Sequence, residues 1–291
     1  MSAPVRRAAF LTLADPTGFV MDDDLAIEPL ALRGWAVETV PWNRSAVDWA
    51  RYDLAVIRST WDYQHHTADF LVTLAAIEKA GVRLENGIDI VRWNIGKTYL
   101  RELETKGVPT VPTLWRDRLN RGGLLPLFDE LQSELAVIKP VVSGNAEGAW
   151  RLDRARVQAL APEIETYYAG RALMMQPFER GILDEGEYSL VYFCGVLSHG
   201  ILKVPKSGDF RVQEEHGADI RAIRVEPELR AAGDAAIAAI GRQLLYARAD
   251  LVRSAHGFRV MELELVEPAL YLRMDVGAPE RFALAVDSLF V

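Results

Sequence analysis

The chain has 291 residues, of which 50% are hydrophobic and 25% are charged. This globular balance excludes disorder, collagen and coiled coil as the main class, and the length predicts two or three lobes. With 33 basic against 41 acidic residues, the net charge of −8 argues against nucleic acid or anionic lipid as a partner held by bulk charge. The sequence has no apolar run long enough for a membrane span, and its single cysteine, Cys194, suits a reducing cytoplasm.

The first part of the chain alternates short apolar strands with helices. Strands are predicted at 7–13, 36–42, 54–60 and 82–86, with helices at 22–33 and 67–80. Asp15 and Pro16 cut off the first apolar run after a few residues, which favours a buried strand over a targeting signal. Alternating strands and helices predict a parallel sheet covered by helices.

The later elements follow a different pattern. The sequence predicts helices and strands in mixed order, then longer strands joined by turns, so the fold class is α/β that becomes α+β in the C-terminal half. The expected helices are 96–107, 124–133, 152–160 and 227–245, and the expected strands are 135–140, 173–178, 188–193, 197–203, 246–252 and 258–266.

Polar residues follow two strands of the first lobe. Asp15 follows the first strand, while Arg58 and Asp62 end the third together with Trp61 and Tyr63. Ligands of open parallel sheets bind beyond the carboxyl ends of the strands, so these residues could form a pocket. A capping turn with packed aromatic rings explains them equally well. The usual glycine-rich nucleotide motifs are absent from this lobe.

A predicted hairpin near the C-terminus brings three carboxylates together. A symmetric turn centred on His256 places Asp250 opposite Glu262, and alternation puts Glu264 on the same face. Opposed like charges destabilise a sheet, so a divalent cation with oxygen ligands is the natural compensation. A solvated outer face, or a register slip of one residue, remains the alternative.

Several basic residues are candidates for binding phosphate. Lys139 ends an apolar strand and is followed by the small-residue loop 143–148, whose backbone could approach phosphate oxygens. Lys97 is expected at the start of a helix, and Lys203 and Arg211 flank a glycine-containing segment that could be a lid. Each of these residues alone would pass for an ordinary surface charge.

Together these positions resemble the ATP-grasp superfamily, which includes glutathione synthetase and D-alanine–D-alanine ligase. The matching segments are NIGK at 94–97, VIKP at 137–140, MQPF at 175–178, GEYS at 186–189, GDFR at 208–211, and Asp250 with MELE at 261–264. RSTWDY at 58–63 and ELELVEP at 262–268 are similar to a subgroup containing a cyclo-ligase that closes the ring of O-ureido-serine with ATP.

The resemblance implies three lobes that clamp ATP. They are a Rossmann-like domain over 1–95, a central lid subdomain over 96–172, and a C-terminal subdomain with the metal site over 173–291. Lys97 and Lys139 would contact the ATP phosphates, with Ser143 and Gly144 in the covering loop. The adenine and ribose would be held by Gln176, Pro177, Phe178 and Glu187.

The same resemblance implies the catalytic and metal residues. Lys203 would approach the phosphates, and Arg211 would stabilise the charge that develops during phosphoryl transfer. Asp250, Glu262 and Glu264 would hold Mg²⁺ or Mn²⁺, although many relatives carry asparagine in place of Glu264, which leaves the number of ions open. The acceptor pocket would be lined by Asp15, Arg58, Asp62 and Glu267.

The activity that the resemblance implies is a carboxylate–amine ligase. ATP would convert a carboxylate into an acyl phosphate, which a nitrogen nucleophile attacks. The substrate would be a small amino-acid-like molecule, and a homodimer is common among such ligases although nothing in the sequence specifies an interface. The alternatives are a small-molecule kinase on the same fold and a nucleotide-binding regulatory module without catalysis.

Overall fold

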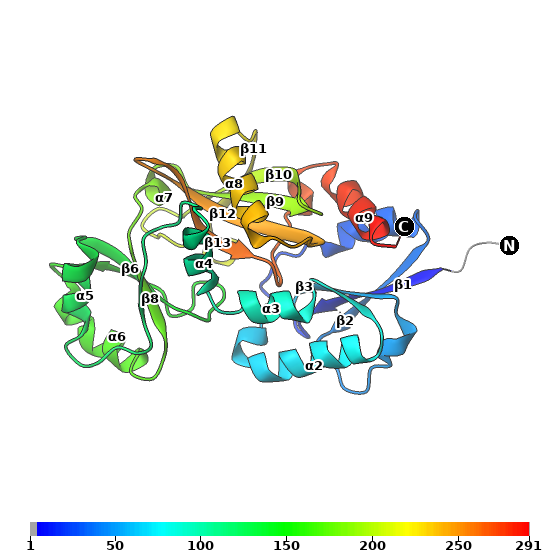
Figure 1. Cartoon of the computed structure of the whole chain (residues 1–291), viewed down its shortest axis with the longest axis horizontal. Helices are drawn as coiled ribbons and strands as arrows, with labels where there is room; N and C mark the ends of the chain where they lie inside the picture. Colours follow the sequence, from blue (N-terminus) through cyan, green and yellow to red (C-terminus); the bar gives the residue numbers. More distant parts are fainter. Residues whose placement is uncertain (1–4, 291) are drawn as a thin grey trace.

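The computed structural model describes residues 5–290 and contains three sheets (Figure 1). The first is a parallel sheet of order β2-β1-β3-β4. Its strands are β1 (Arg6–Thr12), β2 (Trp35–Pro41), β3 (Leu54–Ser59) and β4 (Arg83–Glu85). The parallel sheet predicted from the alternating pattern is therefore confirmed.

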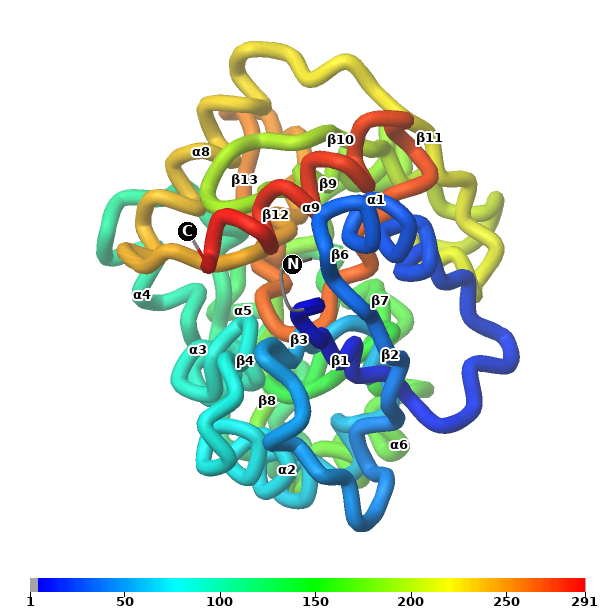
Figure 2. The backbone as a smooth tube through the Cα atoms, turned by 90° about the vertical axis from the view of Figure 1, so that its right-hand side faces the viewer, coloured from blue at the N-terminus to red at the C-terminus, as the bar shows by residue number. Residues whose placement is uncertain are grey.

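Helices cover both faces of the parallel sheet. Phe70, Leu74 and Ile77 of α2 (Thr67–Lys79) pack against one face. The other face meets α1 (Ile27–Ala31) and the C-terminal helix α9 (Ala278–Ser288), which lie side by side in Figure 2. The helix predicted at 22–33 is shorter, because Pro29 is tolerated only within the first turn of an α-helix, and a 3₁₀ turn over Asp23–Ala26 precedes it.

The second sheet is antiparallel and forms the lobe at the left of Figure 1. Its order β5-β8-β6-β7 joins β5 (Leu114–Arg116), β8 (Leu173–Pro177), β6 (Leu135–Pro140) and β7 (Trp150–Asp153). Two helices, α5 (Leu124–Leu131) and α6 (Ala161–Tyr167), complete its core. We refer to this unit as the lid lobe.

Two expectations for the lid lobe need correction. The helix predicted at 152–160 is wrong, because Leu152 belongs to β7 and pairs with Ala136 of β6, a contact that local periodicity does not reveal. The boundary expected between residues 172 and 173 separates β8 from its neighbours in the sheet. Since Met175 pairs with both Ile138 and Leu114, the sheet of the lid lobe extends through β8.

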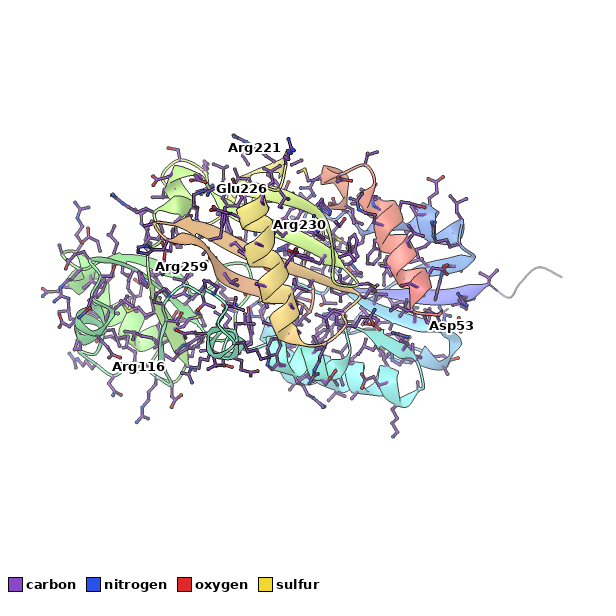
Figure 3. The ribbon with its side chains drawn as sticks, turned by 45° about the horizontal axis from the view of Figure 1, so that its top comes forward. Asp53, Arg116, Arg221, Glu226, Arg230 and Arg259 are labelled. Atoms are coloured by element: carbon purple, nitrogen blue, oxygen red, sulfur yellow. The ribbon has the colours of Figure 1, made fainter. Side chains whose placement is uncertain are left out.

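The third sheet is antiparallel, with the order β11-β10-β9-β12-β13. Its strands are β11 (Asp219–Ile223), β10 (Val196–Val204), β9 (Glu187–Phe193), β12 (Tyr246–Ser254) and β13 (Gly257–Glu264). Figure 3 shows α8 (Pro227–Ile240) lying across one face of this sheet, where Leu190, Tyr192, Ala249 and Leu263 are buried. The opposite face carries the polar side chains described below.

Short helices connect the lobes. The helix expected at 96–107 begins later, as α4 (Tyr99–Thr105), and is preceded by α3 (Ile88–Asn94). Lys97 therefore lies in a turn between two helices rather than at a helix start. The remaining short helix is α7 (Gly181–Asp184). Within residues 5–290, no helix is long and apolar enough to cross a membrane.

Candidate active site

A cavity of about 250 Å³ lies where the lid lobe, the third sheet and the parallel-sheet lobe meet. All three units contribute side chains to its wall. Most of the predicted site residues line it, namely Lys97, Lys139, Ser143, Gly144, Gln176, Pro177, Phe178, Glu187, Lys203, Arg211, Asp250, Glu262, Glu264 and Glu267. The fold thus gathers residues that are far apart in the sequence.

The floor of the cavity is the polar face of the third sheet. Lys203 on β10 contacts Glu187 on β9 and lies 3.5 Å from Asp250 on β12. Asp250 also accepts a hydrogen bond from the hydroxyl of Ser189. Lys203, Glu187 and Asp250 are each less than 10% exposed, so the floor is a buried network of alternating charges.

Arg248 is a central member of this network that the sequence analysis missed. Its guanidinium donates to both oxygens of Asp250, at 2.9 and 3.0 Å, and also pairs with Glu264. Arg248 is 5% exposed and lines the cavity. The available signal was its position two residues before Asp250 on the same strand, which places both side chains on one face.

The predicted pairing of Asp250 with Glu262 is confirmed, although the turn differs from the predicted one. Ser254 pairs with Gly257, so the turn is tighter than one centred on His256. A β-bulge at Met261 then adds one unpaired residue and restores the expected register at Glu262 and Glu264. Phe258 and Val260 face α8, and only the bulge turns the two glutamates to the cavity.

The backbone of β13 is fixed from outside the sheet. Asn94 donates to the Leu263 carbonyl and accepts from the Leu265 amide, both at 2.9 Å. The Tyr99 hydroxyl bonds the carbonyl and amide of Leu263 at 3.0 and 2.9 Å. These contacts satisfy backbone groups that an edge strand would otherwise leave unpaired, and they hold Glu262 and Glu264 in place.

The floor carboxylates titrate differently because their partners differ. Burial alone would raise the pKa of Asp250, but Arg248 and Lys203 outweigh burial and hold that pKa below its usual value. Burial also acts on Glu262, whose pKa is nevertheless lowered by Lys97 and Lys139. Burial raises the pKa of Glu264 to about 7, with Asp250 and Glu262 adding to the effect and Arg248 opposing it.

Two lysines and a loop form the side of the cavity toward the lid lobe. The Lys97 ammonium lies 2.8 Å from Glu262 and donates to the Ser143 carbonyl at 2.9 Å. Lys139 on β6 has no acidic oxygen within 4.0 Å among residues 5–290, and burial lowers its pKa. Gly148 ends the loop at φ +68°, where a Cβ would clash with the Tyr167 hydroxyl.

Glu147 of the same loop points away from the cavity. It does not line the cavity and instead lies 3.5 Å from His65 of the parallel-sheet lobe. The loop therefore presents Ser143 and Gly144 to the cavity and its carboxylate to the neighbouring lobe.

Aromatic and amide groups line the cavity where the lid lobe meets the segment after β10. The Phe178 ring lies 6.4 Å from Phe210 and 5.2 Å from the Arg151 guanidinium. Gln176 is 3% exposed and donates to the Thr113 hydroxyl at 2.9 Å. Arg211 lines the cavity, but Asp209 binds its guanidinium at 2.7 Å, so this structure does not show it free to meet a ligand.

The wall toward the parallel-sheet lobe contains Trp61, Tyr63 and Glu267. Three residues expected in this pocket lie elsewhere. Arg58 is 1% exposed and binds Asp23 at 3.0 Å and the Pro268 carbonyl at 2.8 Å, so it holds the wall from behind. Asp62 accepts from the Trp42 indole at 2.6 Å and does not line the cavity.

Asp15 is the third of these residues. It is exposed, does not line the cavity, and accepts a hydrogen bond from the Thr17 amide at 3.0 Å. Asp15 thus caps a local turn. The sequence placed it at the correct strand end but could not show that this turn faces solvent.

The carboxylate oxygens on the floor are the kind of ligand that a hard divalent cation prefers. Asp250 and Glu262 are directly opposed, and Glu264 lies on the same face. In this structure their oxygens contact Arg248, Lys203 and Lys97, and the described residues contain no group of three metal-binding side chains. A cation bound here would therefore take over oxygens that basic side chains now hold.

The fold resembles that of known ligases. D-alanine–D-alanine ligase from Bacillus anthracis superposes with a TM-score of 0.69 at 14% identity, over 97% of this chain and 95% of that one. The fold and the charged cavity define the class as the ATP-grasp ligases, which are ATP-dependent enzymes.

More specific comparisons define the family. Residues 8–86 match the family described as D-cycloserine synthetase DcsG, N-terminal domain. The cycloserine biosynthesis protein DcsG of Streptomyces lavendulae is 30% identical, over 94% of this chain and 96% of the relative. The crystal structure of D-cycloserine synthetase DcsG superposes with a TM-score of 0.84 at 28% identity, over 97% of this chain and 99% of that one. This chain belongs to the DcsG family.

Proposed function

We propose that this protein is an ATP- and Mg²⁺-dependent ligase that forms a carbon–nitrogen bond on a small amino-acid-like substrate through an acyl phosphate. The proposal rests on one observation: Lys97, Lys139, Arg248 and the floor carboxylates all line the same cavity. Cations for phosphate and oxygen donors for a metal are what phosphoryl transfer to a carboxylate requires.

The basic residues of the cavity would hold the nucleotide. Lys139 would bind the phosphates, since it has no acidic partner among the described residues. Lys97 would join it by exchanging Glu262 for a phosphate oxygen, while Lys203 would contribute from the floor. Backbone groups of Ser143 and Gly144 would cover the phosphates, and the adenine and ribose would be held by Gln176, Pro177, Phe178 and Glu187.

Asp250, Glu262 and Glu264 would hold Mg²⁺, with Mn²⁺ as an alternative. When bound, the metal would neutralise phosphate charge and so lower the barrier to transfer. The residues of this chain align the reacting groups and exclude water, which would otherwise hydrolyse the acyl phosphate.

Arg248 is better placed than Arg211 to stabilise charge on the substrate. Both guanidinium groups are paired with carboxylates, but Arg248 lies on the cavity floor with both of its partners, Asp250 and Glu264, whereas the partner of Arg211, Asp209, does not line this cavity. We infer that Arg248 orients the substrate carboxylate toward the γ-phosphate and then stabilises the oxyanion of nitrogen attack. Arg211 would assist if the nucleotide drew it away from Asp209.

The relatives support a ring-closing reaction. They are named for cycloserine synthesis, and the segments 58–63 and 262–268 share the pattern of that subgroup. O-ureido-serine is accordingly the first substrate to test. The same cavity chemistry would also serve a reaction that joins two molecules, so other amino acids belong in the assay.

The test is phosphate counting with the full chain, ATP and Mg²⁺. We expect O-ureido-serine to release ADP and free phosphate in equal amounts, and ¹⁸O in its carboxylate to appear in the phosphate. ADP release with phosphate retained on a stable product would favour the kinase. If neither O-ureido-serine nor a broad panel of amino acids raised ADP above background, the proposed function would fail.

A further inference from the structure

One enclosed carboxylate of the cavity differs from the others in having no cationic partner. Among the described residues, every other carboxylate lining the cavity lies within 4.0 Å of a lysine or arginine nitrogen, apart from the exposed Glu215. Glu267 lines the cavity and has no such contact. The chain therefore compensates its enclosed negative charges almost completely, with this one exception.

The backbone around Glu267 is held in place, and the nearby cations are already bound to other groups. The indole of Trp61 donates to the Glu267 carbonyl at 2.9 Å. The guanidinium of the buried Arg58 donates to the next carbonyl, that of Pro268, at 2.8 Å. Lys97, the cation whose charge most affects Glu267, is already held by Glu262 and the Ser143 carbonyl.

The surroundings of Glu267 are aromatic and acidic. Tyr63 is 7% exposed and lines the cavity, and burial together with the charge of Glu267 raises the pKa of its hydroxyl. Trp61 packs on Phe19 with ring centroids 5.1 Å apart, and both rings line the same cavity. Burial, together with the charge of Glu264, raises the pKa of Glu267 to about 8, which shows that the position lacks positive charge.

We propose that Glu267 binds the protonated amino group of the substrate, with Trp61 and Tyr63 forming the wall around it. An ammonium would supply the positive charge that no basic side chain among the described residues provides at this carboxylate, and aromatic faces attract cations. The substrate would then be an amino acid with a free amine rather than an N-acylated one. This inference rests on the proposed function, since it concerns the substrate of the same cavity.

The geometry favours an ammonium over a metal ion at this position. A divalent cation prefers several oxygen ligands, which the floor provides at Asp250, Glu262 and Glu264. The wall around Glu267 instead carries the aromatic side chains of Trp61 and Tyr63, and of the floor carboxylates Glu264 and Glu262 affect its pKa most. A setting of one carboxylate and aromatic faces suits a monovalent ammonium better than a divalent ion that needs several oxygen ligands.

The experiment compares O-ureido-serine with its analogue in which hydrogen replaces the amino group. Binding to the wild-type chain and to Glu267→Gln is measured by calorimetry with AMPPNP and Mg²⁺ present, and turnover by ADP release. We expect the wild type to bind O-ureido-serine at least tenfold more tightly than the analogue. Glu267→Gln should lose most of that preference while its KM for ATP stays within twofold.

Stability separates a binding role from a structural one. Because burial disfavours the charged form of Glu267 and no cation among the described residues compensates it, its replacement by Gln should leave the melting temperature unchanged or raise it. Glu104→Gln, an exposed glutamate on α4, is the matched control and should alter neither binding nor melting.

The outcomes also separate this inference from the proposed function. Equal binding of O-ureido-serine and the analogue by the wild type would overturn it, as would an unchanged preference in Glu267→Gln or a lowered melting temperature. An undetectable affinity of the wild type for O-ureido-serine would overturn it too. Preference for the amino compound without any ADP release would uphold the ammonium site and contradict the ligase.

Discussion

One carboxylate on the floor of the cavity and one on its aromatic wall differ in their cationic partners and in the direction of their pKa shifts. Asp250 on the floor contacts Arg248, Lys203 and Ser189, and its pKa lies below the usual value despite burial. Glu267 on the wall has no cationic partner among the described residues, and its pKa rises to about 8. Burial acts on both carboxyl groups, and the presence or absence of a built-in cationic partner decides in which direction each pKa moves.

The comparison indicates a division of labour. The floor is pre-organised, because its charges are satisfied before any ligand arrives and the nucleotide complex must exchange with them. The wall is incomplete without a ligand. The experiments below test this difference, beginning with the largest expected effect.

Replacing Arg248 with Gln should damage both stability and activity. The change leaves Asp250 and Glu264 enclosed without the guanidinium that they share, and breaking a buried ion pair costs about 3–5 kcal/mol. Urea unfolding measures the loss, and ADP release should fall to background. Arg248→Lys should recover part of the stability, and a variant as stable as the wild type would show that the floor network contributes little.

Replacing Lys139 with Met should separate activity from stability. Lys139 has no acidic partner among the described residues, so the fold should keep its melting temperature, while kcat/KM for ATP falls about 100-fold or more. Lys79→Met, an exposed lysine near the end of α2, is the control. Turnover that survives in Lys139→Met would remove this lysine from the phosphate site.

Tyr99→Phe tests the support of the floor from outside the sheet. The lost hydroxyl leaves the buried amide of Leu263 unpaired and removes one of the two donors to its carbonyl, which keeps Asn94; this should cost about 1–3 kcal/mol in unfolding free energy. Activity should fall less than in the Lys139 variant, because Glu262 and Glu264 are displaced rather than removed. An unchanged urea midpoint would contradict this account of β13.

The pH dependence of stability should distinguish the wall from the floor. The folded-state pKa of Glu267, about 8, exceeds its usual 4.5, so the folded chain binds more protons and loses stability as pH rises between those values. Glu267→Gln lacks this contribution. The free energy of unfolding of Glu267→Gln, relative to the wild type, should rise by about 1.4 kcal/mol or more from pH 5 to pH 8, since each pKa unit between the folded and unfolded states is worth about that amount.

Glu147→Gln should have the smallest effect. Its pairing with His65 joins two side chains that are each more than half exposed, and such pairs contribute less than about 1 kcal/mol. We expect a melting temperature close to that of the wild type and turnover within twofold. A large loss of activity would instead place this carboxylate in the closure of the loop over the phosphates.

The sequence predicted the parts of the site that follow from local alternation. The facing of Asp250, Glu262 and Glu264 came from the period of two along a strand, and the parallel sheet from alternating apolar segments. Arg248 was accessible to the same argument, because it precedes Asp250 by two residues. An arginine beside three carboxylates is not typical of a metal site, so the residue type gave no signal of its own.

Other features depend on contacts that no local pattern contains. Leu152 pairs across to Ala136, so β7 could not be told from a helix by periodicity. Arg58 and Asp62 stand at a strand end, as predicted, but which side chain turns to the cavity is decided by Pro268 and Trp42, which are distant in sequence. The unpaired state of Glu267 likewise became visible only once every neighbour had been placed.

The extra residue in β13 has a consequence for how this fold tolerates insertions and deletions. Met261 shifts the alternation by one place, so the chain before it and the chain after it follow opposite phases. Loss of a single residue there would exchange inside for outside, sending Glu262 and Glu264 among the apolar side chains beneath α8. An insertion or deletion of one residue in this strand would therefore change which side chains line the cavity. Only insertions or deletions of two residues would keep the charged side chains on the cavity side.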